Sequence, residues 1–158
     1  MEFTELLDAF AADAGMTEPV AYGKDGDQCS LEINGRDFGF CHRAEAGRLV
    51  IWTEIGELPP EGREALFARL LRENFMNPDL PEGFLSLSDD DVVCAQCTMR
   101  MPVCDKDEFY LLLLRFMTVA DEWAQMLDGI GRDDSADAES RKAEFPSSLS
   151  SSSPFLQV

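Results

Sequence analysis

Hydrophobic positions along the chain predict eight secondary-structure elements. Over residues 2–14 apolar side chains recur every three or four positions, which is typical of an amphipathic helix. Residues 29–33 and 36–43 instead alternate between apolar and polar side chains, as half-buried strands do. Asn34-Gly35 separates these two strands and predicts a tight hairpin, because both central residues of a type I′ turn need a positive φ.

The third strand, 49–55, carries apolar side chains on both of its faces, so we expect it to lie in the centre of a sheet. A second helix is predicted from Pro59-Pro60 to about Asn74, because proline at the first helical turn costs no hydrogen bond. Short strands at 84–88 and 92–101 flank a run of three aspartates and form a second hairpin.

The last predicted helix starts after Asp105, a plausible N-cap with Glu108 at capping-box spacing, and runs to about Ile130. The fold class is therefore α+β in the order α-β-β-β-α-β-β-α, with helices packed on a twisted antiparallel sheet. We expect one domain over residues 1–130. Residues 131–158 are acidic and then serine-rich, and their low hydrophobicity predicts a disordered tail.

The charge balance narrows the choice of partners. The chain has 13 Lys and Arg against 31 Asp and Glu, a formal net charge of −18. Nucleic acids and anionic membranes are disfavoured, because both require clustered cations. A cationic or amphipathic polypeptide remains an attractive partner. The carboxylates near the start do not fit a signal peptide, Arg115 ends the most apolar stretch, and five cysteines fit a reducing compartment, so we expect a cytoplasmic protein.

Candidate catalytic groups are few. Cys94 and Cys97, with Cys104 and the pair Cys41-His42, could form a metal or redox site. Period-two alternation, however, sends Cys94 and Cys97 to opposite faces of a strand, and His42 is the only histidine. We therefore predict no enzymatic activity, no cofactor and no metal. A metal- or thiol-dependent enzyme that uses Cys94, Cys97 and His42 is the least favoured alternative.

Residues 133–144 carry oxygen-bearing side chains at several positions of a calcium-binding loop. Ala138 stands where the sharp turn of such a loop needs glycine, and no helix is expected to follow. A solvated acidic tail is therefore the favoured interpretation of this segment.

Surplus apolar surface is the feature that indicates a function. A short sheet with helices on one side cannot bury the second helix, the flank of the last helix and both faces of the third strand. We predict a symmetric homodimer that buries the second helix and an adjacent strand, and that leaves part of the sheet for a partner.

Six segments follow one another in a specific order and spacing over nearly all of residues 1–130, although each by itself is a loose apolar pattern. They are residues 3–10, FTELLDAF; 29–33, CSLEI; 52–59, WTEIGELP; 66–75, LFARLLRENF; 83–88, GFLSLS; and the closing helix from EFYLLLL, 108–114, to Trp123. Together these segments resemble the class I type III secretion chaperones of the Tir-chaperone (CesT-like) family.

The resemblance implies a small, acidic, cytosolic bacterial homodimer without enzymatic activity. Such proteins hold the N-terminal segment of a secreted effector in an extended form, keep it soluble and present it to the export machinery, of which the ATPase is a possible contact. Our hypothesis places effector binding and the dimer interface on two sets of residues. They are Phe38, Phe40, Ile51 and Trp52 for the effector, and Leu66, Leu70 and Leu85 for the dimer.

A second function class stays open at this point. The same dimer could be a regulatory or inhibitory module that docks a folded partner. The two classes differ in what is bound, because a chaperone captures a disordered segment whereas a docking module needs a folded domain.

Overall fold

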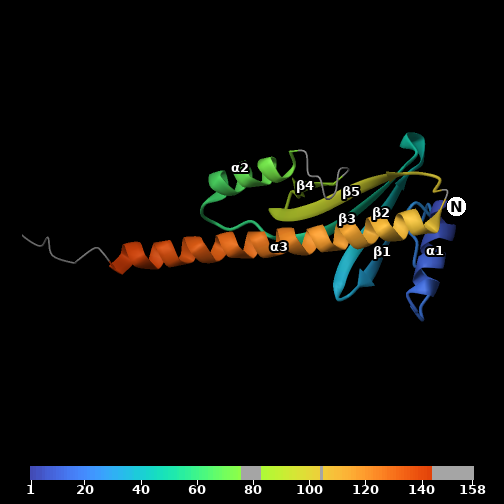
Figure 1. Ribbon diagram of the computed structural model, residues 1–158, viewed down its shortest axis with the longest axis horizontal. Coiled ribbons are helices and arrows are strands. Elements are labelled where there is room, and N and C mark those ends of the chain that lie inside the picture. Colours follow the sequence, from blue (N-terminus) through green and yellow to red (C-terminus); the bar gives the residue numbers. More distant parts are fainter. Residues whose placement is uncertain (76–82, 104, 144–158) are drawn as a thin grey trace, which may run out of the picture.

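The computed structural model describes residues 1–75, 83–103 and 105–143, with side chains described as far as residue 129 (Figure 1). Its element order confirms the predicted α-β-β-β-α-β-β-α arrangement, with one short 3₁₀ turn, Ala44–Ala46, added between the second and third strands. The elements are α1 (Phe3–Asp13), β1 (Gln28–Ile33), β2 (Arg36–Arg43), β3 (Arg48–Glu57), α2 (Arg63–Glu73), β4 (Gly83–Leu87), β5 (Val92–Arg100) and α3 (Lys106–Ala143).

The five strands form one antiparallel sheet in the order β1-β2-β3-β5-β4, which confirms the central place of β3. Asn34 and Gly35 have φ values of 54° and 78°, as the predicted hairpin turn requires. The register of β3 against β5 shifts between Glu54 and Gly56, where a β-bulge bends the end of the central strand.

The second helix begins later than its prolines predicted. Helix α2 starts at Arg63, after Gly62, whose φ of 69° is outside the helical region. The Nε of Arg63 donates to the carbonyl oxygen of Pro59 at 3.2 Å. Pro59 therefore contacts the first turn of α2, but the prolines are not part of the helix. The buried side chain of Leu58 anchors the proline segment to the core.

Helix α3 begins as predicted and ends much later. Asp105 caps its start, since its Oδ1 accepts the backbone N–H of Asp107 at 3.0 Å. The helix then continues to Ala143, well past the end predicted near Ile130 (Figure 1). The sequence between these residues lacks proline and contains several alanines, so an established helix can propagate without an apolar stripe. Residues 144–158 of the predicted tail lie outside the described part of the chain.

Helices α1 and α3 pack on one face of the sheet and enclose the core. Rings from the strands meet rings from α3, with centroids 5.9 Å apart for Phe38 and Phe116 and 6.4 Å apart for Phe40 and Phe109. Phe10 of α1 meets Phe109 edge to face at 5.8 Å. The aromatic cluster therefore joins both helices to the same face of the sheet.

A polar contact also fastens α1 to α3. The Oδ2 of Asp13 accepts hydrogen bonds from the Nζ of Lys106 at 2.7 Å and from the hydroxyl of Tyr110 at 2.8 Å. The hydrogen bond from Lys106 is the main cause that lowers the pKa of Asp13. Both partners lie at the solvent-exposed start of α3, so this contact orients α1 more than it stabilises it.

Candidate protein-binding site

The sheet face opposite α1 and α3 forms an apolar surface that we call the open face. Its middle row is given by the strand register, in which residues directly opposite each other share a face. From β1 to β4 the row contains Ser30, Gly39, Trp52, Gln96 and Phe84. Trp52 and Gln96 are partly exposed and Phe84 is exposed, so the centre of this face is accessible.

Gly39 allows the indole of Trp52 to lie directly against the sheet. A Cβ at position 39 would lie 2.0 Å from the Cζ2 of Trp52, far inside any real contact. The glycine is therefore needed for space, and not for an unusual backbone conformation. The result is a flat aromatic surface in the middle of the open face, with Val50 as its apolar neighbour two positions back on β3.

The two ends of the open face carry opposite charges. Glu32, Asp37 and Glu54 are exposed near one end of β1, β2 and β3. At the other end Arg43, Arg48 and Arg100 lie opposite one another on β2, β3 and β5. An apolar centre between charged ends is a typical composition for a protein-binding surface.

The structure places the predicted effector-binding residues on two different faces. Phe38, Phe40 and Ile51 point toward α1 and α3 and are buried, with 0 to 1 % of their surface exposed. Trp52 lies on the open face and is partly exposed. Of the four, the structure therefore brings only Trp52 to the accessible surface, while the other three form the core beneath it.

Sequence reasoning missed Gly39 and Phe84 as parts of this surface. Period-two alternation along β2 places Gly39 on the face opposite to Phe38 and Phe40. The sequence therefore did indicate that Gly39 and Phe38 belong to different faces. The sequence does not show, however, which of the two faces of a strand the helices cover. That information comes from the packing of α3.

A second exposed apolar surface lies on α2. Phe67, Leu71 and Phe75 follow one another at four-residue spacing, and Leu71 and Phe75 expose 70 % and 76 % of their surface. Helix α2 lies beside β4 (Figure 1), where Phe84 and Leu87 are also exposed. The predicted dimer residues Leu66, Leu70 and Leu85 are buried within the protomer and hold α2 on β4.

The end of α2 occupies the outer edge of β4. The side-chain amide of Asn74 donates to the carbonyl oxygen of Leu85 at 3.0 Å, and its oxygen accepts the N–H of Leu85 at 2.6 Å. This paired contact imitates the hydrogen bonding of a neighbouring strand. The middle of β4 is therefore not available to another chain while α2 is in place.

We expect Asn74→Ala to lower the free energy of unfolding by about 1 to 2 kcal/mol, because two partly buried backbone groups of Leu85 lose their partners. The variant should also aggregate at lower concentration, since the edge of β4 becomes free to pair. Urea unfolding with Arg72→Ala, an exposed neighbour, as control measures the first effect. Equal stability of the two variants would show that the contact is incidental.

The four cysteines that the structure describes do not converge on a common site, and Cys104 lies outside the described residues. Cys94 lies on the open face and pairs in register with Glu54, whereas Cys97 pairs with Ile51 on the core face. Burial raises the pKa of the Cys94 thiol, and the nearby Glu54 carboxylate adds to the effect. In the described part of the chain no three residues of the types that bind metals are grouped.

The reactivity of Cys29 tests whether its thiol is buried. Burial is the main cause that raises the pKa of its thiol to about 12, with a contribution from the charge of Asp8. Only the thiolate is alkylated, so at pH 8 the reaction with iodoacetamide should be about a thousandfold slower than for an ordinary cysteine. Mass spectrometry of native and guanidinium-unfolded protein measures the ratio; similar rates in both states would contradict the burial.

Comparison with known proteins agrees with the fold. A model of the Tir chaperone protein (CesT) family matches residues 5–124. The chain is similar to a chain of the ExsC–ExsE complex, with 18 % identity, a TM-score of 0.67 and coverage of 80 % of this chain and 97 % of that one. No relative was found among curated protein sequences.

Two further solved structures have the same fold. The Yersinia pestis type III secretion chaperone SycH, solved with a fragment of YscM2, has 19 % identity, a TM-score of 0.60 and coverage of 78 % and 98 %. A chain of the HopA1–SchA chaperone–effector complex has 15 % identity, a TM-score of 0.60 and coverage of 77 % and 91 %.

The sheet has an open face, and one family model matches the chain over most of its length. These features define a chaperone of type III secretion. The chain belongs to the Tir chaperone protein (CesT) family. Among the described residues, every helix is too short or too polar to span a membrane.

Proposed function

We propose that this chaperone works in the bacterial cytoplasm as a homodimer that binds the N-terminal segment of an effector in extended form and keeps it ready for secretion. The observation that supports this most is the open face, where Trp52 and Phe84 stay accessible in a member of a chaperone family. Holding a client at the open face requires no catalytic group, and we assign a catalytic role to no residue.

The outer side of β1 is the better edge for an added client strand. Asn74 covers the corresponding edge of β4 at Leu85. On β1, Tyr22 pairs with Cys29 and the N–H of Gly23 donates to the carbonyl oxygen of Gln28, which covers only the start of the strand. An extended client can therefore continue the sheet beyond Cys29 and reach the open face from that side.

The acidic end of the open face favours a basic client on the β1 side. Glu32 lies on β1, the edge that the client would join, and Asp37 and Glu54 lie at the same end of β2 and β3. Their charges attract lysine and arginine side chains and raise the association rate. Added salt screens this attraction, so the association rate should fall as the salt concentration rises. The apolar centre around Trp52 then supplies most of the affinity.

For self-association we infer that α2 provides the contact. The predicted residues Leu66, Leu70 and Leu85 support this surface from beneath, and Phe67 and Leu71 are the side chains that a second copy can reach. A twofold axis next to α2 pairs this apolar stripe with its own copy, so the stripe is buried in the dimer.

We infer that residues 1–130 form the binding unit and that residues 131–158 act outside it. Truncation after Gly131 should leave a single cooperative melting transition, because the core residues with described side chains end at Leu127. Differential scanning calorimetry checks this. A broad or missing transition would show that the distal part of α3 stabilises the domain.

Co-expression with the product of the neighbouring reading frame tests the proposed function. Limited proteolysis of the complex should leave one N-terminal stretch of the partner protected. Trp52→Ala should weaken the complex about tenfold, the loss expected when a central aromatic contact is truncated, and Leu114→Ala on α3 is the control. Protection of a folded domain, with no effect of Trp52→Ala, would instead favour the regulatory docking module.

A further inference from the structure

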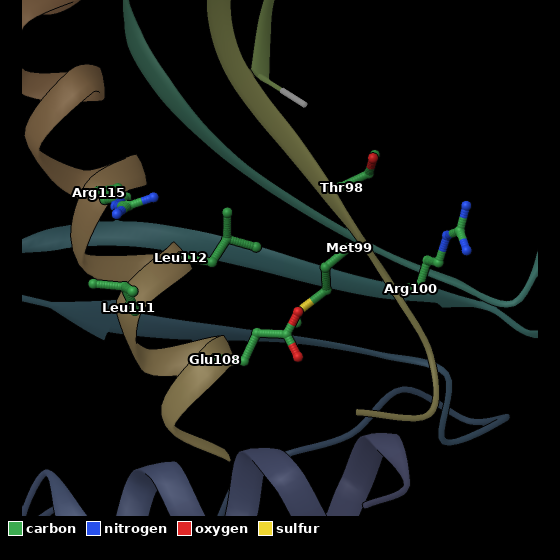
Figure 2. A pocket seen from close by; sticks show the side chains of 7 residues that line it. All are labelled: Thr98, Met99, Arg100, Glu108, Leu111, Leu112 and Arg115. Atoms are coloured by element: carbon green, nitrogen blue, oxygen red, sulfur yellow. The ribbon is translucent and has the colours of Figure 1, made fainter. Parts of the chain in front are cut away.

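A groove between the first half of α3 and the end of β5 differs in charge from the rest of the protein. It has a volume of about 420 Å³. Figure 2 shows its lining, with Arg115 on the α3 side and Arg100 on the strand side. Its lining residues are Thr98, Met99, Arg100, Glu108, Leu111, Leu112 and Arg115.

Helix α3 presents one continuous stripe to this groove. Glu108, Leu111, Leu112 and Arg115 stand at positions i, i+3, i+4 and i+7, so they share one side of the helix. Leu111 exposes 50 % of its surface, whereas Met99 on the opposite wall is buried. The groove therefore has an apolar floor that stays accessible from solvent.

The charge of the lining is opposite to that of the chain. Two arginines and one glutamate give the groove a charge of +1 from +2 and −1, against −18 for the whole protein. The guanidinium groups of Arg100 and Arg115 form no ion pair or hydrogen bond with a residue that the structure describes, whereas Arg36, Arg63 and Lys106 each pair with an aspartate. Two unpaired arginines at one groove are unexpected where carboxylates are so numerous.

The cationic character extends from the groove across the end of the open face. Arg100 lies directly opposite Arg48, and Arg48 lies directly opposite Arg43. Arg48 also donates to the Oγ1 of Thr98 at 3.1 Å, which links the row to the groove wall. Like charges opposite each other on neighbouring strands destabilise a sheet, so an anionic group bound here would relieve that repulsion.

We propose that this groove binds an acidic side chain of the client together with an adjacent apolar side chain. The inference rests on the proposed function and adds a sequence preference to it. A guanidinium binds a carboxylate through two parallel hydrogen bonds, and Leu111 and Leu112 offer a surface for the neighbouring apolar group. A polypeptide is the occupant that the observations favour, because the overall charge of the chain repels polyphosphates such as nucleic acids.

This placement also gives the client a defined register. Carboxylates at one end of the open face select basic residues, and the arginines at the opposite end select acidic ones. A client that carries both kinds of residue in the right order satisfies both ends, whereas a shifted client brings like charges together.

Selection from a display library of random 12-residue peptides tests the groove without a known client. Peptides bound by the wild-type protein should be enriched in an aspartate or glutamate next to an apolar residue. Arg100→Gln with Arg115→Gln should bind these peptides about tenfold more weakly, as two surface ion pairs are lost. Lys24→Gln with Arg69→Gln changes the net charge equally at two exposed sites and should leave binding unchanged.

Charge reversal separates recognition from a structural effect. Arg100→Glu with Arg115→Glu should enrich lysine and arginine at the positions where the wild type enriches acids, with an unchanged circular dichroism spectrum. Peptides that bind the wild type without acidic enrichment, or that ignore both arginine variants, would overturn the groove and leave the proposed function intact. Failure of the wild type to bind any peptide would overturn both.

Discussion

Gly39→Ala lowers the free energy of unfolding by about 2 kcal/mol, although alanine is normally better than glycine in a strand. The added Cβ would stand 2.0 Å from the ring of Trp52, so the indole must leave the sheet and lose much of its apolar burial. For a chain of this size, the melting temperature should fall by roughly 4 to 8 °C. Urea unfolding and differential scanning calorimetry measure the two quantities.

A double-mutant cycle shows whether the effect comes from Trp52. In a Trp52→Ala background the clash is absent, so Gly39→Ala should stabilise the protein by about 0.5 kcal/mol through the lower chain entropy of alanine. Destabilisation of similar size in both backgrounds would contradict the contact and place the requirement for glycine elsewhere. The Gly39→Ala single variant also reports on the open face, because it displaces the indole without removing it.

Phe67→Asp combined with Leu71→Asp converts the proposed dimer to a monomer. Both side chains belong to the exposed stripe of α2, and two unpaired carboxylates in an apolar interface cost several kcal/mol. The mass from light scattering should fall from twice 17.6 kDa to 17.6 kDa. The fold should persist, since neither side chain belongs to the core.

Leu114→Asp is the matched control for that prediction. Leu114 is an exposed leucine on α3, away from α2, and its replacement should leave the dimer mass unchanged. If the α2 variant kept the mass of the wild type, the stripe of Phe67 and Leu71 would not be the interface. If the Leu114 variant also became monomeric, the interface would extend to α3.

Much of the fold follows from local patterns in the sequence. Asn34-Gly35 fixes a hairpin because of its positive φ values, and the two apolar faces of β3 fix its central place. The end of α3 could not be predicted in this way. Its apolar stripe stops near Leu127, but a helix that is already formed continues as long as no residue breaks it.

The site is less predictable than the fold, for a geometric reason. Alternation along β3 shows that Ile51 and Trp52 point in opposite directions, yet it does not show which direction α3 covers. The same limit applies to α2, whose apolar side is wide enough to hold both buried Leu66 and exposed Phe67. Three-dimensional packing decides which member of each pair reaches solvent.

Helix α2 and the open face divide self-association and client binding between them. The stripe on α2 offers a contact to a second copy, and Asn74 on the same helix occupies the edge of β4. The open face and the edge of β1 then remain for the client. Covering one edge and leaving the other free gives a sheet that can be extended on one side only, which limits uncontrolled aggregation.

Titration of the isolated N-terminal segment of the effector into the purified chaperone tests whether the chaperone recognises an extended client. By calorimetry, the segment alone should bind the wild-type dimer with defined stoichiometry, and the effector that lacks this segment should not bind. The heat capacity change should be negative, because apolar surface around Trp52 is buried. Binding of the truncated, folded effector with no binding of the isolated segment would contradict the account.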